Sequence, residues 1–142
     1  MKPDFGADIP FVKNLGVALE HLGDGQAVLH FAPRPDHCNS FGVTHGGALA
    51  TFSDIIMVMA ARSVNMDHGV VTIEMKNSFL RPAPVSESGA PLVGKGKLLH
   101  RTRSMAFVEG HIYNAEGQLC VVSSGTFKYV PPRQPAAVSG VK

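Results

Sequence analysis

The sequence is poor in the residues that mark several large classes of protein. It has no tryptophan, two cysteines and a formal net charge of only +2. Cys38 and Cys120 are too few for a disulfide scaffold, and neither belongs to a CxxC pair or a Cys/His cluster with zinc spacing. No run of basic residues resembles a polyanion-binding tail. We therefore expect no metal site, no nucleic-acid partner and a reducing cytoplasmic location.

Long apolar runs are also missing. No segment approaches the roughly 18 apolar residues of a membrane span, and the first ten residues carry charges and prolines where a signal peptide has an apolar core. We expect neither membrane insertion nor export. Apolar residues make up 44% of the 142 residues and charged ones 17%, a composition typical of globular proteins. The length fits one domain over residues 1–142, with a loose Pro-rich tail at about 131–142.

Alternation of apolar and polar residues predicts mostly β-structure. A hairpin with strands near 15–21 and 26–32 surrounds Gly23-Asp24-Gly25, and an irregular connection follows over 33–43. Further strands are predicted within 69–82, 91–101, 104–117 and 118–130. Residues 46–63 lack proline and favour a helix that is apolar nearly all round, as buried helices are. The pattern predicts an α+β fold, with an antiparallel sheet wrapped around one long helix.

The start of this predicted helix has the features of an oxyanion site. His45 precedes Gly46 and Gly47, whose backbone N–H groups a ligand can approach closely, and the helix dipole adds positive charge there. Such donors stabilise a carbonyl oxygen that gains negative charge during acyl transfer. Alternatively, the two glycines serve only close packing. For His45, capping of the helix or a hydrogen bond to a loop is favoured over proton transfer.

Asp54 is the one ionisable side chain within an otherwise apolar helix. An ionised carboxylate there costs several kcal/mol unless it is paired or faces a wet cavity, so it is either an arginine's structural partner or a functional group. Nine residues from His45 to Asp54 correspond to about 900° and about 13.5 Å along a helix, half a turn out of phase. If both serve one reaction, the site combines Gly46 of one subunit with Asp54 of another, in an obligate dimer.

Residues 39–54, NSFGVTHGGALATFSD, resemble the Asn-x-x-Gly-x-x-His-Gly-Gly-x-x-x-x-x-x-Asp signature of hotdog-fold acyl-CoA thioesterases of the PaaI-like group. The resemblance extends from PFVKNLGV near the start, through NSFLRPAP, to GTFKYV, and leaves out only the tail. It implies the hotdog fold, in which a curved antiparallel sheet wraps a long helix. It also implies a homodimer with sheets paired edge to edge, often a dimer of dimers, with each active site at the subunit interface.

The resemblance also implies roles for individual residues in hydrolysis of an acyl-CoA or aroyl-CoA thioester. Gly46 supplies the main oxyanion N–H, with Gly47 supporting the turn, while His45 and Asn39 shape the same pocket. Asp54 of the partner subunit is general base, or nucleophile through an anhydride. Thr72 stands where relatives carry a hydroxyl near the attacking water, although it could equally be an ordinary strand residue.

Substrate contacts are less closely determined by the sequence. The acyl pocket would draw side chains from both subunits, with Phe52, Ile55, Met59 and Phe79 as candidates. Guanidinium groups suit the phosphates of coenzyme A, and the candidates are Arg81, Arg101 and Arg103, each of which could instead be solvated on a strand edge. Coenzyme A belongs to the substrate, and no separate cofactor is expected.

Other functions fit the sequence less well. A module that binds acyl-CoA without turnover would have no reason to retain a costly buried carboxylate. Hotdog dehydratases and hydratases use different His/acid patterns. No G-x-S-x-G motif is present, and Ser123-Ser124-Gly125 lies within a predicted strand rather than at a strand-to-helix turn. Which acyl group is cleaved, whether two dimers associate, and which role Asp54 takes are left open by the sequence.

Overall fold

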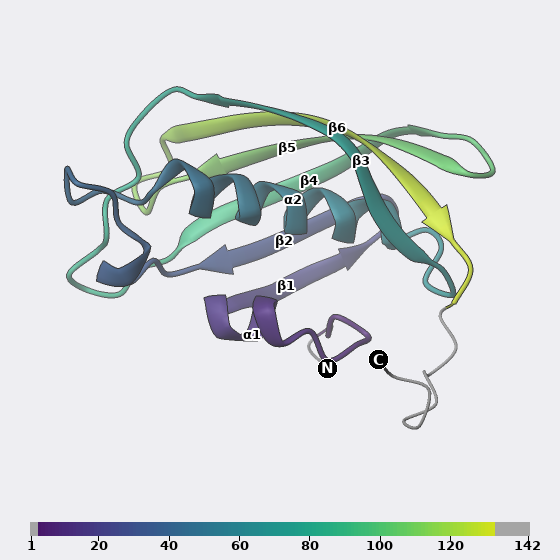
Figure 1. Cartoon of the computed structure of the whole chain (residues 1–142), viewed down its shortest axis with the longest axis horizontal. Coiled ribbons are helices and arrows are strands. Elements are labelled where there is room, and N and C mark those ends of the chain that lie inside the picture. Colours follow the sequence, from purple (N-terminus) through teal and green to yellow (C-terminus); the bar gives the residue numbers. More distant parts are fainter. Residues whose placement is uncertain (1–2, 133–142) are drawn as a thin grey trace, which may run out of the picture.

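The computed structural model describes residues 3–132, and a curved antiparallel sheet wrapped around one long helix makes up most of it (Figure 1). The helix is α2 (Gly46–Arg62). The six strands lie in the order β1-β2-β4-β5-β6-β3. Their bounds are β1 (Val17–Gly23), β2 (Gln26–Phe31), β3 (Gly69–Phe79), β4 (Leu92–Arg101), β5 (Met105–Tyr113) and β6 (Leu119–Val130). The predicted fold class and the hotdog arrangement are confirmed.

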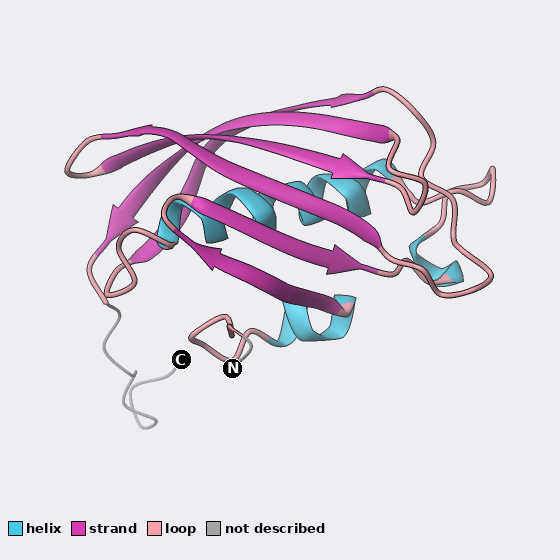
Figure 2. Cartoon of the chain, turned by 180° about the vertical axis from the view of Figure 1, so that it is seen from behind, coloured by secondary structure: helices cyan, strands magenta, loops and turns pink. Residues whose placement is uncertain are grey.

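Helix α2 is buried against the concave face of the sheet, as its apolar sequence predicted. In Figure 2 the strands curve around it. Its side chains Phe52, Ile56 and Met57 have no exposed surface, and together with Phe31 and Phe127 they form the centre of the core. Full burial of such side chains is worth about 1.5–3 kcal/mol each. The core therefore fixes which helix face points at the sheet and which face stays open.

Two glycines of β4 let the helix lie this close. A Cβ on Gly96 would come within 2.7 Å of the Ile56 carbonyl oxygen, and one on Gly94 within 2.2 Å of Ile56 Cδ1. The absence of side chains at these positions therefore sets the distance between sheet and helix.

The first strand begins later than predicted. Residues 10–15 form a short helix, α1 (Pro10–Leu15), which ends at Gly16 with φ 84°. The predicted strand near 15–21 is therefore wrong at its start, because Leu15 packs as part of α1 and β1 begins at Val17. The turn between β1 and β2 is confirmed: Asp24 and Gly25 both have positive φ, as a two-residue hairpin turn requires.

The connection over 33–43 contains one 3-10 turn (Pro35–His37) and is otherwise irregular, as predicted. The predicted tail falls almost wholly outside the described residues. Within residues 3–132, no helix is both long and apolar enough to cross a membrane. Cys38 and Cys120 form no disulfide, and burial raises the pKa of the Cys120 thiol.

The two edges of the sheet differ. Helix α1 lies beside the β1 edge in Figures 1 and 2. The other edge is β3, an eleven-residue strand on which most residues are exposed, among them Val71 at 43% and Ile73 at 54%. A long apolar edge strand is a ready template for pairing with another chain. Strand β3 is therefore an unpaired edge of the sheet that carries exposed apolar side chains.

Candidate active site

The N-terminus of α2 has the geometry of an anion-binding helix end. His45 is the N-cap, and its Nδ1 accepts a hydrogen bond from the Gly47 N–H at 2.8 Å, which confirms the interpretation of His45 as a cap. The Gly46 N–H donates to no acceptor among residues 3–132. Because Nδ1 of the neutral ring is an acceptor here, the proton of His45 resides on Nε2. The backbone N–H predicted to serve the oxyanion is thus available to a ligand.

Asn39 organises the loop that leads into this helix. Its side-chain Oδ1 accepts hydrogen bonds from the Phe41 N–H at 2.9 Å and the Val43 N–H at 3.3 Å. The side-chain amide donates to no described residue. The carboxamide oxygen therefore holds the loop, while its NH₂ group can orient a substrate or a water.

An open pocket of about 310 Å³ joins these groups to the end of β3. Asn39, Gly46, Phe79 and Arg81 all line it. The Phe79 ring is close to Gly46, since a Cβ on that glycine would lie 3.8 Å from the ring. The structure thus brings together four of the residues that the sequence analysis singled out, and Arg81 is the one of the three candidate arginines that lines the same pocket as Gly46.

Asp54 lies on the open face of α2 and is half-buried. The Thr72 hydroxyl donates to Asp54 Oδ1 at 2.5 Å, so the helix carboxylate and the edge strand β3 meet directly. Asp54 forms no ion pair with a described Lys, Arg or His. The alternative in which Asp54 is the structural partner of an arginine therefore finds no support within residues 3–132.

Within one chain, Asp54 and Gly46 lie far apart. Both lie on α2, eight positions apart, which corresponds to about 12 Å along the helix axis. A thioester carbonyl cannot be within hydrogen-bond reach of one and attacking distance of the other.

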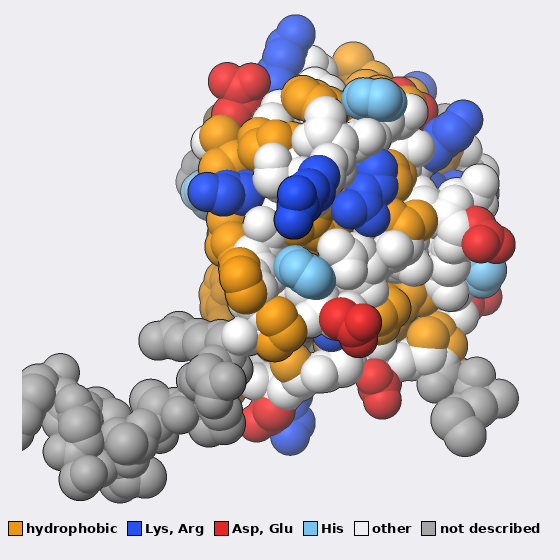
Figure 3. All heavy atoms as spheres, turned by 90° about the vertical axis from the view of Figure 1, so that its right-hand side faces the viewer, with side chains coloured by type: hydrophobic (Ala, Val, Ile, Leu, Met, Phe, Trp, Pro, Cys, Tyr) orange, Lys and Arg blue, Asp and Glu red, His pale blue; other side chains and the backbone are white. Residues whose placement is uncertain are grey.

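The remaining candidate residues lie elsewhere in the protomer. Phe52, Ile55 and Met59 are buried in its core, and their place in an acyl pocket stays a prediction. Arg101 stacks on the Tyr129 ring at 4.4 Å, and the Tyr129 hydroxyl donates to the Ala61 carbonyl at 2.7 Å. Arg101 therefore lies near the last turn of α2, and Arg103 lies in the turn between β4 and β5. Figure 3 shows several Lys and Arg side chains on the face of the molecule at the right of Figure 1.

Sequence reasoning missed two contacts at the site. It placed Thr72 near the attacking water but not in a direct bond to Asp54, and it placed Phe79 in an acyl pocket rather than beside Gly46. Both contacts join α2 to β3, and no local pattern encodes the register of one element on the other. Within the described residues, no group of three or more His, Cys, Asp or Glu side chains could hold a metal ion.

Comparison with known proteins agrees with this geometry. A family model of the thioesterase superfamily matches residues 41–121. A Saccharolobus solfataricus protein described as a candidate esterase is 30% identical over 81% of this chain and 79% of its own. Human acyl-coenzyme A thioesterase 13 is 27% identical over 77% of each chain. The Escherichia coli PaaI protein has the same fold, with a TM-score of 0.80 at 20% identity over 88% of this chain and 87% of that one. The chain therefore belongs to the thioesterase superfamily and is a thioester hydrolase, as the resemblance predicted.

Proposed function

We propose that the protein hydrolyses an acyl-CoA or aroyl-CoA thioester to the free acid and CoA, in a site that two subunits share. The observation that carries the proposal is the Asp54–Thr72 pair, a carboxylate with no described counter-cation that is held on the open face of α2 by a hydroxyl 2.5 Å away. A carboxylate placed in this way is oriented for chemistry rather than neutralised.

A dimer through β3 supplies the missing half of the site. Pairing of two β3 edges about a twofold axis would continue the sheet and cover the exposed Val71 and Ile73. It would also set the two α2 helices side by side, each with its open face toward the other. With antiparallel helices, Gly46 of one subunit approaches Asp54 of the other, which the spacing within one helix forbids.

The chemistry then needs only groups of this chain and one water. In the general-base route, the carboxylate of Asp54 takes a proton from water as the water oxygen attacks the thioester carbon. The carbonyl oxygen gains negative charge and accepts a hydrogen bond from the partner's Gly46 N–H. Collapse of the tetrahedral intermediate breaks the C–S bond, and the proton passes to the CoA sulfur.

In the nucleophilic route, the same carboxylate attacks the thioester carbon, expels CoA and leaves a mixed anhydride that water then cleaves. Both routes give one acid and one CoA thiol per water consumed. Thr72 orients the carboxylate in either case, and Asn39 positions the carbonyl or the water from the other subunit. Arg81, at the pocket that contains Gly46, is the candidate for a coenzyme A phosphate, with Arg101 and Arg103 as more distant ones.

Replacement of the carboxylate tests the proposal. In Asp54→Asn the side chain keeps its shape but can neither accept the proton nor attack, so release of free CoA, followed with DTNB over a panel of acyl- and aroyl-CoAs, should fall about 100-fold or more. The matched control is Asp24→Asn, a change in the β1–β2 turn where asparagine also adopts positive φ, and it should leave the rate unchanged. Full activity of Asp54→Asn on the best substrate would show that another group is the base.

A further inference from the structure

Helix α2 and strand β3 face each other along a line of residues that starts at the Asp54–Thr72 pair and that we call the crevice. One helical turn after Asp54 comes Val58, and two residues before Thr72 on the same face of β3 comes Val70. Another turn on, the Arg62 Nε donates to the His68 carbonyl at 3.3 Å. The crevice thus has a reactive pair at one end, an apolar pair next to it and a cationic side chain about 12 Å from Asp54.

A cavity occupies the far part of this crevice. It measures about 430 Å³ and is lined by both valines, by Met59 and Arg62, by Asp67 and His68, and by residues of the N-terminal segment that include Phe5 and Ile9. This volume is typical of a site for a small ligand, and its apolar walls suit an acyl group better than the phosphates of coenzyme A. Both valines of the apolar pair line the cavity, and Val58 lies one helical turn from Asp54.

Arg62 closes the cavity by clamping the N-terminal segment. Its guanidinium donates to the Phe5 carbonyl at 2.6 Å and to the Met66 carbonyl at 3.1 Å, in addition to His68. Gly6 has φ +70°, and a Cβ on it would lie 2.7 Å from the guanidinium. The segment therefore passes directly over the arginine, in a conformation that glycine adopts without strain.

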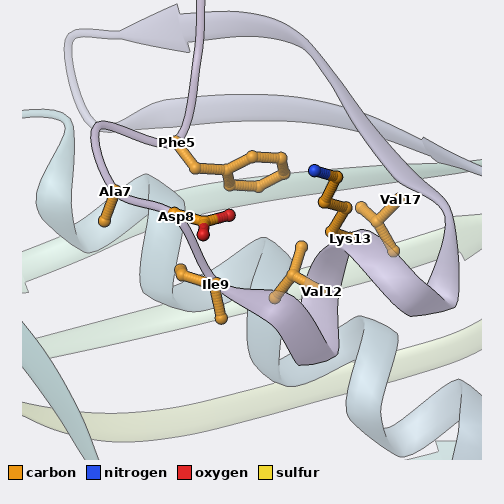
Figure 4. A pocket seen from close by; sticks show the side chains of 7 residues that line it. All are labelled: Phe5, Ala7, Asp8, Ile9, Val12, Lys13 and Val17. Atoms are coloured by element: carbon orange, nitrogen blue, oxygen red, sulfur yellow. The ribbon is translucent and has the colours of Figure 1, made fainter.

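The Phe5 side chain also holds this N-terminal segment in place. Figure 4 shows the ring extending across α1 toward Lys13 and Val17. Phe5 also packs against the hydrophobic core. The segment is thus held by the Phe5 ring and by the hydrogen bonds of Arg62. The cavity ends at the Arg62 guanidinium, and an apolar chain that covered this charge would bury it at a cost in free energy.

We propose that this cavity holds the distal part of the acyl group, and that the Arg62 clamp on residues 5–6 sets the greatest acyl length. The inference rests on the proposed function, because it takes Asp54 as the point of hydrolysis. A span of about 12 Å accommodates an extended chain of about ten carbons, because each C–C bond of about 1.5 Å advances a zigzag chain by only about 1.25 Å. The protein is accordingly selective for thioesters of medium-length apolar acids.

The test compares kcat/KM for acetyl-, hexanoyl-, octanoyl- and dodecanoyl-CoA. In the natural protein the value should rise to octanoyl-CoA and fall at dodecanoyl-CoA. Val58→Phe fills the crevice next to Asp54 and should lower the octanoyl-to-acetyl ratio at least about 10-fold, since single methylenes already discriminate by that factor. The matched control, Val28→Phe, adds the same bulk to β2, on the opposite face of the sheet from the buried Ala27 and Leu29, and should keep the ratio of the natural protein.

A second variant tests the end of the cavity at Arg62. Arg62→Lys keeps the charge but loses the planar guanidinium that donates to three carbonyls. The kcat/KM for dodecanoyl-CoA should therefore rise at least about 10-fold relative to the value for hexanoyl-CoA. Release of CoA with chain-length ratios that neither variant changes would overturn the inference and leave the proposed function standing. If the natural protein released CoA from an aroyl-CoA but from none of the four thioesters, the inference would be overturned and the proposed function would stand. Release of CoA from no acyl- or aroyl-CoA would contradict both.

Discussion

Gly46 has two properties that suit the proposed role of oxyanion donor. Its N–H is the first of helix α2 and bonds to no described residue, whereas the next N–H, of Gly47, is taken by the His45 cap. The cap therefore separates a structural donor from a free one. A donor of this kind, fixed by the backbone and needing no reorganisation, is worth about 10²–10³ in rate.

Gly46→Pro removes this N–H and little else. Proline is favoured at the first helical position, and His45, with φ −61° and ψ 139°, already has the conformation preferred before proline. We expect a folded protein whose kcat falls about 100-fold. Gly46→Ala is the matched control because it adds a Cβ that meets only the Phe79 ring, at 3.8 Å, and retains the N–H. Equal losses in the two variants, measured by DTNB, would assign the effect to bulk instead.

At the scale of elements, the distance between α2 and the sheet is set by glycine on β4. Gly96 faces the Ile56 carbonyl oxygen, which cannot move without distorting the helix, whereas Gly110 on β5 faces the Met57 side chain at 3.1 Å. Methionine adapts its shape easily. One added methyl group should therefore lower the free energy of unfolding by different amounts at the two positions.

Gly96→Ala should lower the free energy of unfolding by about 2 kcal/mol, within the range for overpacked cores. Gly110→Ala should lower the free energy of unfolding clearly less than Gly96→Ala does, because Met57 can change rotamer. Urea unfolding followed by circular dichroism measures both values. A Gly96→Ala protein as stable as Gly110→Ala would mean that the helix shifts freely on the sheet.

The elements themselves were largely predictable. Period-2 alternation located the strands, and the apolar run without proline located α2 to within one residue of its end. Helix α1 was missed because six residues that begin with proline give no helical period. Contacts between elements could not be predicted: the Thr72–Asp54 bond depends on the placement of β3 on α2, and the Arg62–Phe5 bond joins residues 57 apart.

At the scale of the whole molecule, one chain holds the groups of the proposed reaction at two separate places on α2. Gly46, Asn39 and Arg81 lie at the start of α2, while Asp54 and Thr72 lie at its middle. In the proposed dimer, a second copy would pair with the exposed β3 edge and complete the site. Each helix would then work in two active sites, giving its N-terminus to one and its carboxylate to the other.

A heterodimer of two inactive chains tests this central claim most directly. Gly46→Pro and Asp54→Asn chains carry different affinity tags, are coexpressed, and the mixed dimer is isolated through both tags. One of its shared sites would combine an intact Gly46 N–H with an intact Asp54, and the other would have both lesions. The account predicts CoA release at about half the natural rate per dimer, although each parent homodimer is inactive. A mixed dimer as inactive as its parents would contradict it, because every site would then lie within a single chain.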